Sequence, residues 1–341
     1  MSALSLRRRG GRRLLANRCP NRDYGFAFSG MLTTGRGVRV FRGFVRGSQD
    51  YLSSIIGYCV GVHDNVPGGV EGYAVVSGRG LVLMGGFRRS DVRGMEYEID
   101  VDEVKRGIFL TPYSETGGAG SVNEDSAIKV SIRDCANGYL WYIGAVADGV
   151  GGFNRGDVAS EITVKEFAEI TTANLSSISG GTLSDIVWRI HDTLYSNYTG
   201  RGVSLGSTLA AVVINRHEDD EDAAFHAVNV GDTRIYHIYA SGESGGGIDE
   251  LSVSDKVSGH VISQAIGYML REVHVTGGSL KPGDYLVLVT DGVSDVMDRE
   301  SIKDITITHK YPWDSSRALV KVARGQGSQD DATALVVWFN G

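Results

Sequence analysis

The chain has 341 residues, of which 42% are hydrophobic, so it can bury a sizeable core as one large domain or two smaller ones. It has no long uninterrupted apolar run, and no apolar segment follows its basic N-terminus, so we expect neither a membrane span nor a signal peptide. Its three scattered cysteines, Cys19, Cys59 and Cys135, favour a reducing compartment, a cytoplasmic location and the absence of a disulfide framework.

The net charge of −7 is unevenly distributed along the chain. Residues 1–106 hold 17 basic and 10 acidic side chains, whereas residues 107–341 hold 17 basic and 31 acidic ones. The acidic part suits cation binding. The basic part could contact an anionic partner or its acidic neighbour. Ordinary surface arginines are a simpler explanation for the positive charge of residues 1–106, so we expect no nucleic-acid partner.

The first 106 residues contain no motif that carries chemistry. Residues 1–21, rich in Arg and Gly, are expected to form a basic flexible arm. Residues 22–106 form a Gly-rich, β-like region of unknown role, in which Tyr73–Val76 and Leu81–Met84 are apolar runs typical of strands.

From residue 107 onward, short strands alternate with longer helical segments. Strands are expected over Leu140–Ala147, Leu209–Ile214, Ala224–Val230, Arg234–Tyr239, Tyr285–Thr290 and Thr333–Phe339. Helices are expected over Val158–Ile170, Leu183–Tyr195 with Thr182 or Ser184 as cap, Val261–Met269 and Ser315–Ala323. Hairpin-like strands and paired helices predict an α+β domain with mostly antiparallel sheets.

Carboxylates lie at the ends of apolar strands in five places. The residues are Asp125, Asp148, Asp232, Asp291 and Asp330. Each alone is explained by a turn, because Asp caps its own backbone and a following Gly accepts positive φ. Together they are harder to explain, because a carboxylate beside an apolar core is costly unless a positive charge neutralises it.

Hard divalent cations supply such a charge and prefer oxygen ligands, whereas no cluster of His or Cys points to zinc or copper. Two such cations held roughly 4 Å apart lower the pKa of a shared water and attract an anionic phosphate. The pattern therefore predicts metal-assisted hydrolysis of a phosphate ester, without saying which ester.

Seven short motifs follow one another in the acidic part of the chain. They are Asn123–Ser126, Asp148–Gly152, Gly156–Ser160, Gly206–Leu209, Gly231–Arg234, Thr290–Asp295 and Asp330–Thr333. In this order they resemble the metal-dependent 2C-type (PPM) family of serine/threonine protein phosphatases. The resemblance implies an α+β fold, in which two antiparallel β-sheets form a sandwich flanked by helix pairs (αββα). Residues 107–341 would form this phosphatase domain, behind a β-rich, Gly-rich N-terminal extension.

The resemblance also implies a catalytic centre formed by Asp148, Asp291 and Asp330. By position, Asp148 would bridge two metal ions, and the Gly149 carbonyl would bind one of them. Asp291 and Asp330 would bind the other.

Further acidic residues match positions around that centre. Asp125 and Glu124 match residues that hold metal-bound waters, and Asp125 is counted in the metal site. Asp232, with Asp291 and Asp295, matches a third metal site seen in many members. The expected cofactors are therefore two or three Mg²⁺ or Mn²⁺ ions.

The chain departs from the family pattern in two places. Gly120 occupies the position of an Arg that grips the substrate phosphate, and Arg155 is a candidate replacement. Val150 and Phe153 occupy positions where some members have a His proposed as general acid.

From these residues we expect hydrolysis of phosphoserine and phosphothreonine on proteins by a metal-activated water. The expected partners are phosphoproteins, including a Ser/Thr kinase or its targets. Two alternatives remain open because of Gly120. One is a non-catalytic binding protein with this fold, and the other is a regulatory phosphatase dedicated to one partner.

Overall fold

The structure is a computed structural model of the chain. It describes residues 26–34, 37–45, 71–77, 80–87, 107–118, 122–150, 155–239, 246–259 and 261–340. The predicted basic arm of residues 1–21 lies outside these ranges. Within them, no helix is both long enough and apolar enough to cross a membrane.

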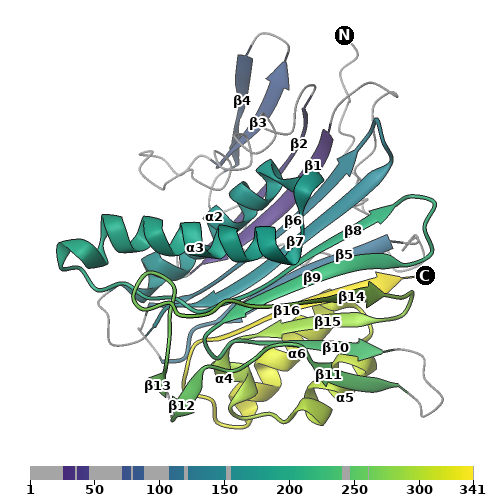
Figure 1. Ribbon diagram of the computed structural model, residues 1–341. Helices are drawn as coiled ribbons and strands as arrows, with labels where there is room; N and C mark the ends of the chain where they lie inside the picture. Colours follow the sequence, from purple (N-terminus) through teal and green to yellow (C-terminus); the bar gives the residue numbers. More distant parts are fainter. Residues whose placement is uncertain are drawn as a thin grey trace.

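Two antiparallel sheets lie face to face, with helices on both outer faces (Figure 1). In spatial order, the seven-stranded sheet contains β14 (His274–Leu280), β9 (Ala223–Val230), β8 (Leu209–His217), β7 (Tyr139–Asp148), β6 (Asp125–Asp134), β1 (Phe26–Thr34) and β2 (Gly37–Val45). The five-stranded sheet contains β11 (Gly247–Glu250), β10 (Arg234–Tyr239), β15 (Tyr285–Val289), β16 (Ala332–Asn340) and β5 (Gly107–Glu115). The predicted α+β sandwich is confirmed.

Helices and two small hairpins complete the described part of the chain. Helices α2 (Gly156–Ala173) and α3 (Gly180–Asn197) cover the seven-stranded sheet, and two short 3₁₀ turns follow them at Leu175–Ser177 and Thr199–Arg201. Helices α4 (Asp291–Ser294), α5 (Arg299–His309) and α6 (Pro312–Gly325) cover the five-stranded sheet. The hairpins are β3 (Glu71–Ser77) with β4 (Gly80–Phe87), and β12 (Lys256–Ser258) with β13 (Val261–Ile262).

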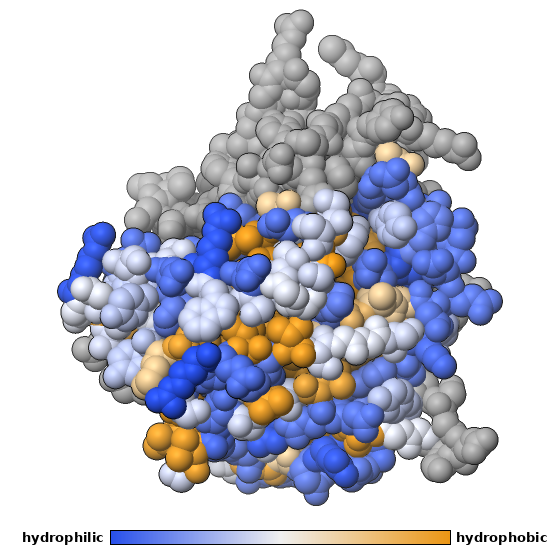
Figure 2. Space-filling model, in the orientation of Figure 1, coloured by the Kyte–Doolittle hydropathy of each residue, from blue (hydrophilic) through white to orange (hydrophobic). Residues whose placement is uncertain are grey.

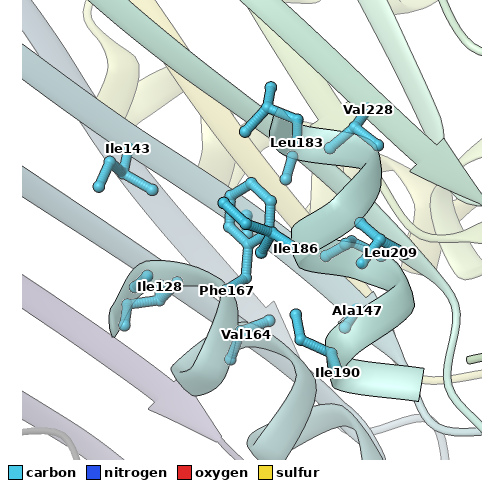
Figure 3. Close-up of a cluster of buried hydrophobic side chains, with 14 of the residues drawn as sticks. Ile128, Ile143, Ala147, Val164, Phe167, Leu183, Ile186, Ile190, Leu209 and Val228 are labelled. Carbon is cyan, nitrogen blue, oxygen red and sulfur yellow. The ribbon is translucent and has the colours of Figure 1, made fainter. Parts of the chain in front are cut away.

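Alternating side chains of the central strands divide the interior into three apolar layers. In β7, Ile143 and Ala145 face helices α2 and α3, whereas Tyr142 and Val146 lie in the cluster between the sheets. Figure 3 shows the first of these layers, where Phe167 of α2 lies among side chains of the sheet and of α3. Because both faces of the seven-stranded sheet are covered, its central strands are apolar on both sides.

The N-terminal region contributes two strands to the seven-stranded sheet. Strand β1 pairs with β6 along its length, from Phe26 opposite Asp134 to Thr33 opposite Ala127. Its side chains Phe28 and Leu32 are each 1% exposed and belong to the same cluster as the α2 and α3 side chains. This part of the N-terminal region therefore packs into the same core as the strands that follow it. The domain boundary after residue 106 stays a prediction.

Most predicted elements are confirmed, and three expectations are wrong. Val261–Met269 was expected to be a helix, but it forms strand β13 and a tight turn, because Gly267 has a φ of +83°. Helix α3 is capped by Ser179, which accepts a hydrogen bond from the Thr182 N–H at 3.2 Å, rather than by Thr182 or Ser184. Cys135 is disulfide-bonded, which contradicts the expected absence of a disulfide framework.

Candidate active site

Two of the predicted site aspartates face each other across neighbouring strands. Asp125 begins β6 and Asp148 ends β7, and the antiparallel register pairs these two residues directly. Directly opposite residues in an antiparallel pair have Cβ atoms about 5 Å apart, so the sheet holds two like charges side by side. Asp125 is 1% exposed, and its Oδ2 accepts hydrogen bonds from the hydroxyls of Thr290 at 2.9 Å and Thr333 at 2.6 Å.

The backbone just after Asp148 is fixed by an unusually close approach. Gly149 N–H donates to the Glu124 carbonyl at 3.1 Å, and the Asp148 carbonyl accepts from Thr208 N–H at 2.8 Å. A Cβ at Gly149 would lie 2.2 Å from the carbonyl oxygen of Gly156, so no larger residue fits there. The chain therefore needs glycine at this point to bring the start of α2 against the end of β7.

Glu124 lies directly before Asp125 and joins the same turn to α2. Its Oε1 accepts from Gly156 N–H at 3.2 Å, and its carbonyl accepts from the Ser160 hydroxyl at 2.5 Å. Its backbone N–H donates to Asp331 Oδ2 at 2.6 Å, while Asp331 Oδ1 accepts from Gly117 N–H at 2.7 Å. Asp331 thus ties the start of β16 to the start of β6. The sequence analysis assigns no role to Asp331, although this residue belongs to the motif Asp330–Thr333.

Asp291 begins the short helix α4, and Asp295 lies one turn later, directly after the last residue of the helix. The Asp295 N–H donates to the Asp291 carbonyl at 2.8 Å, and Thr290, directly before the helix, reaches Asp125. Asp291 is buried at 5% exposure, whereas Asp295 and Asp330 are exposed. Asp330 lies just before β16, the neighbour of β15 in the five-stranded sheet. Carboxylates from both sheets therefore meet at one end of the sandwich.

Asp232 lies in the turn between β9 and β10 and is also 5% exposed. Near it the structure places a positive charge that the sequence analysis did not single out. The Nζ of Lys256, at the start of β12, lies 2.5 Å from Asp295 Oδ2, 3.9 Å from Asp232 Oδ2 and 4.0 Å from Asp291 Oδ2. No spacing rule could have found this contact, because the hairpin that carries Lys256 is far from α4 in the sequence.

The aspartates raise one another's pKa. Burial raises the pKa of Asp148 well above its usual value, and the charges of Asp125, Asp291, Asp330 and Asp232 raise it further. Burial, followed by the charges of Asp232, Asp330 and Asp295, raises the pKa of Asp291 to about 6. Such mutual influence requires the five carboxylates to lie near one another. In its geometry, the structure pairs Asp125 with Asp148 and places Asp232, Asp291 and Asp295 around the Lys256 ammonium group.

The oxygen atoms of these carboxylates are suitable ligands for divalent cations. Asp125 Oδ1 is buried and has no hydrogen-bond partner, so the second oxygen of a buried carboxylate is left for a cation or a proton. The surrounding donors are oxygens, which Mg²⁺ and Mn²⁺ prefer. Among the described residues, no three His, Cys, Asp or Glu side chains are gathered tightly enough to hold a metal ion as they stand. Uncompensated carboxylates repel one another, and burial and the neighbouring carboxylates raise the pKa of Asp148.

The residues expected to handle the substrate phosphate are only partly described. Gly120 and Phe153 lie outside the described residues. Arg155 is exposed at the N-terminal end of α2, directly before Gly156, which contacts both Glu124 and Gly149. Its backbone is thus attached to the site, and its role in phosphate binding stays a prediction.

Comparisons with known proteins identify the family of the chain. Residues 118–335 match the protein phosphatase 2C family, a range that is more than half of the chain. The chain therefore belongs to this family of protein serine/threonine phosphatases. Protein phosphatase PhpP of Streptococcus pneumoniae is 28% identical over 239 residues, which is 62% of this chain and 93% of that protein.

Solved structures are similar over the same part of the chain. PppA, described as a key regulatory component of T6SS in Pseudomonas aeruginosa, is 26% identical with a TM-score of 0.53, covering 68% of this chain and 97% of its own. The catalytic domain of the phosphatase PstP in complex with two manganese ions is 20% identical with a TM-score of 0.53, covering 69% of this chain and 99% of its own. The second likeness shows the fold alone.

Proposed function

We propose that this protein hydrolyses phosphoserine and phosphothreonine esters in proteins, at a centre that holds two or three Mg²⁺ or Mn²⁺ ions. The observation that carries the proposal is the direct pairing of Asp125 with Asp148 across neighbouring strands, with Asp232 and Asp291 gathered around Lys256. The charges of Asp125, Asp232, Asp291 and Asp330 all raise the pKa of Asp148. A structural turn needs one carboxylate, and nothing in folding alone rewards five of them at one end of a sandwich.

Each residue has a distinct part in this proposal. Asp148, between the other carboxylates, and the Gly149 carbonyl would hold one ion, and Asp148 would share a second with Asp291 and Asp330. When bound, the ions would neutralise these carboxylates, draw in the phosphate dianion and make water a better nucleophile. The chain's own part is to hold these oxygens in place before the substrate arrives.

Asp125 and Glu124 act behind that centre. Asp125, fixed by Thr290 and Thr333, leaves one oxygen available to orient a water. Glu124 holds the start of α2 through Gly156 and thereby positions Gly149.

The surface next to the centre supports a protein substrate. Hairpin β12–β13, which carries Lys256, exposes Val257 at 65% and Val261 at 59%. Figure 2 shows hydrophobic side chains gathered at the lower left, where Figure 1 draws this hairpin. An apolar rim favours a peptide flanking the phosphate over a free phosphate ester. We propose that the substrate is a phosphoprotein in the cytoplasm. The proposed partner is a Ser/Thr kinase or one of its targets.

The test measures hydrolysis of p-nitrophenyl phosphate and of a phosphothreonine peptide, with Mn²⁺ and with EDTA. We expect activity that depends on the metal and falls at least about 100-fold in Asp148→Ala and in Asp291→Ala. Asp304→Ala, at an exposed position on α5, is the matched control and should keep full activity. Near-normal turnover by Asp148→Ala would refute the site. Absence of both turnover and bound metal in the wild-type protein would favour the non-catalytic alternative.

A further inference from the structure

The ammonium group of Lys256 lies within 4.0 Å of three carboxylates of the predicted metal site. It donates to both oxygens of Asp295, at 2.6 and 2.5 Å. The Lys256 side chain is only 19% exposed, and those of Asp232 and Asp291 are 6% and 7% exposed. This is therefore a partly desolvated ion cluster, in which charges interact more strongly than at an open surface.

The backbone around Lys256 is held in place by its neighbour Asp255. The Asp255 N–H donates to the Gly231 carbonyl at 2.9 Å, and its Oδ2 accepts from Gly231 N–H at 2.7 Å. The same Oδ2 accepts from Gln264 Nε2 at 2.8 Å. Because Gly231 directly precedes Asp232, these bonds fix the start of β12 against the turn that presents Asp232. β12 lies beside α4 (Figure 1), which begins with Asp291 and is followed directly by Asp295, and Lys256 contacts both aspartates.

The same three carboxylates were expected to hold a third metal ion. An ammonium group and a divalent cation repel each other when they are close. Because Lys256 contacts both oxygens of Asp295, a metal ion bound to either oxygen would lie beside this positive charge. Because the Lys256 ammonium group is covalently part of the chain, its effective concentration at these carboxylates is fixed, whereas that of a metal ion depends on the solution.

We propose that Lys256 is a built-in cation that takes the place of the outer metal ion at Asp232, Asp291 and Asp295. The protein then operates with a two-ion centre on Asp148, Asp291 and Asp330. This inference rests on the proposed function, because it assumes that the inner carboxylates bind metal.

The experiment counts bound metal rather than activity. The protein is stripped with EDTA, and Mn²⁺ binding is followed by calorimetry, with native mass spectrometry giving the number of ions per chain. Wild type is compared with Lys256→Met and Lys256→Gln. Lys303→Met is the matched control, because the Lys303 side chain is 20% exposed, much like that of Lys256, and pairs with Glu300 within α5 rather than with a predicted metal ligand.

We expect each Lys256 variant to bind one manganese ion more than wild type, while Lys303→Met keeps the wild-type number. The double variant Lys256→Met with Asp295→Asn should return to the wild-type number, because the new site uses Asp295. An unchanged count in both Lys256 variants would overturn the inference. If wild type binds no manganese, the proposed function fails, while the difference between wild type and the Lys256 variants still decides the role of Lys256.

Discussion

Asp291→Asn should stabilise the metal-free protein while destroying its catalytic centre. Asp291 is 5% exposed, and its pKa is raised from 3.8 to about 6 by burial and by neighbouring carboxylates. A shift of that size corresponds to about 3 kcal/mol between the two protonation states. The folded-state pKa lies above the unfolded one. The ionised carboxylate therefore adds no penalty below about pH 4, and its destabilisation grows until about pH 6 is passed. Asparagine keeps the shape and removes the charge.

The assay is urea or thermal unfolding in EDTA at several pH values. At pH 7.5, where Asp291 is ionised, the variant should be more stable by about 2–3 kcal/mol, or about 5–10 °C in Tm. The advantage should shrink as the pH approaches about 4. Asp304→Asn, at an exposed position on α5, should change neither value. If Asp291→Asn unfolds at or below the wild-type temperature in EDTA at pH 7.5, then the carboxylates are not crowded together and the argument for the centre fails.

The next prediction concerns the backbone directly after Asp148. Gly149→Ala should destabilise the fold by more than about 2 kcal/mol and abolish activity, because the new Cβ would lie 2.2 Å from the Gly156 carbonyl oxygen. Gly325→Ala, which meets no atom within 4 Å, is the control, and equal unfolding midpoints in urea for the two variants would contradict this reasoning.

Lys129, whose Nζ donates to the Leu110 carbonyl at 2.6 Å, has its pKa lowered from 10.5 to about 8 by burial. The folded state loses this proton first, so the stability of wild type relative to Lys129→Met should rise by about 2–3 kcal/mol between about pH 8 and pH 10.5. Parallel unfolding curves for the two proteins across this range would show that Lys129 is not desolvated.

The strand ends that carry the predicted site residues can be found from the sequence because their signals are local. The run from Leu140 to Ala147 is apolar on both faces, and a charged Asp148 directly after it has few structural explanations. Likewise, the register that pairs Asp125 with Asp148 follows from two antiparallel strands joined by a short turn. Motif order then linked these segments to Asp291, which follows β15, and to Asp330, which precedes β16, both strands of the other sheet.

The missed features depend on contacts between distant segments. Val261–Met269 has apolar residues at helical spacing. However, Ala265 and Met269 bond to each other's backbone, and Gly267 turns the chain between them. The place of Lys256 is set by Asp255 binding the Gly231 turn, which no window along the chain reveals. The position of β1 beside β6 also depends on pairing between segments almost a hundred residues apart.

Strand β1 pairs with β6 in the seven-stranded sheet, and this pairing changes how truncation experiments should be designed. Removing residues 1–106 would take Phe28 and Leu32 out of the interior and leave the hydrogen-bonding edge of β6 open. Such a shortened protein would be prone to pair edge to edge with other copies. If this shortened protein failed to dephosphorylate a partner, the failure could come from damaged folding as readily as from the loss of a docking element. A shortened chain that begins just before Phe26 avoids this ambiguity.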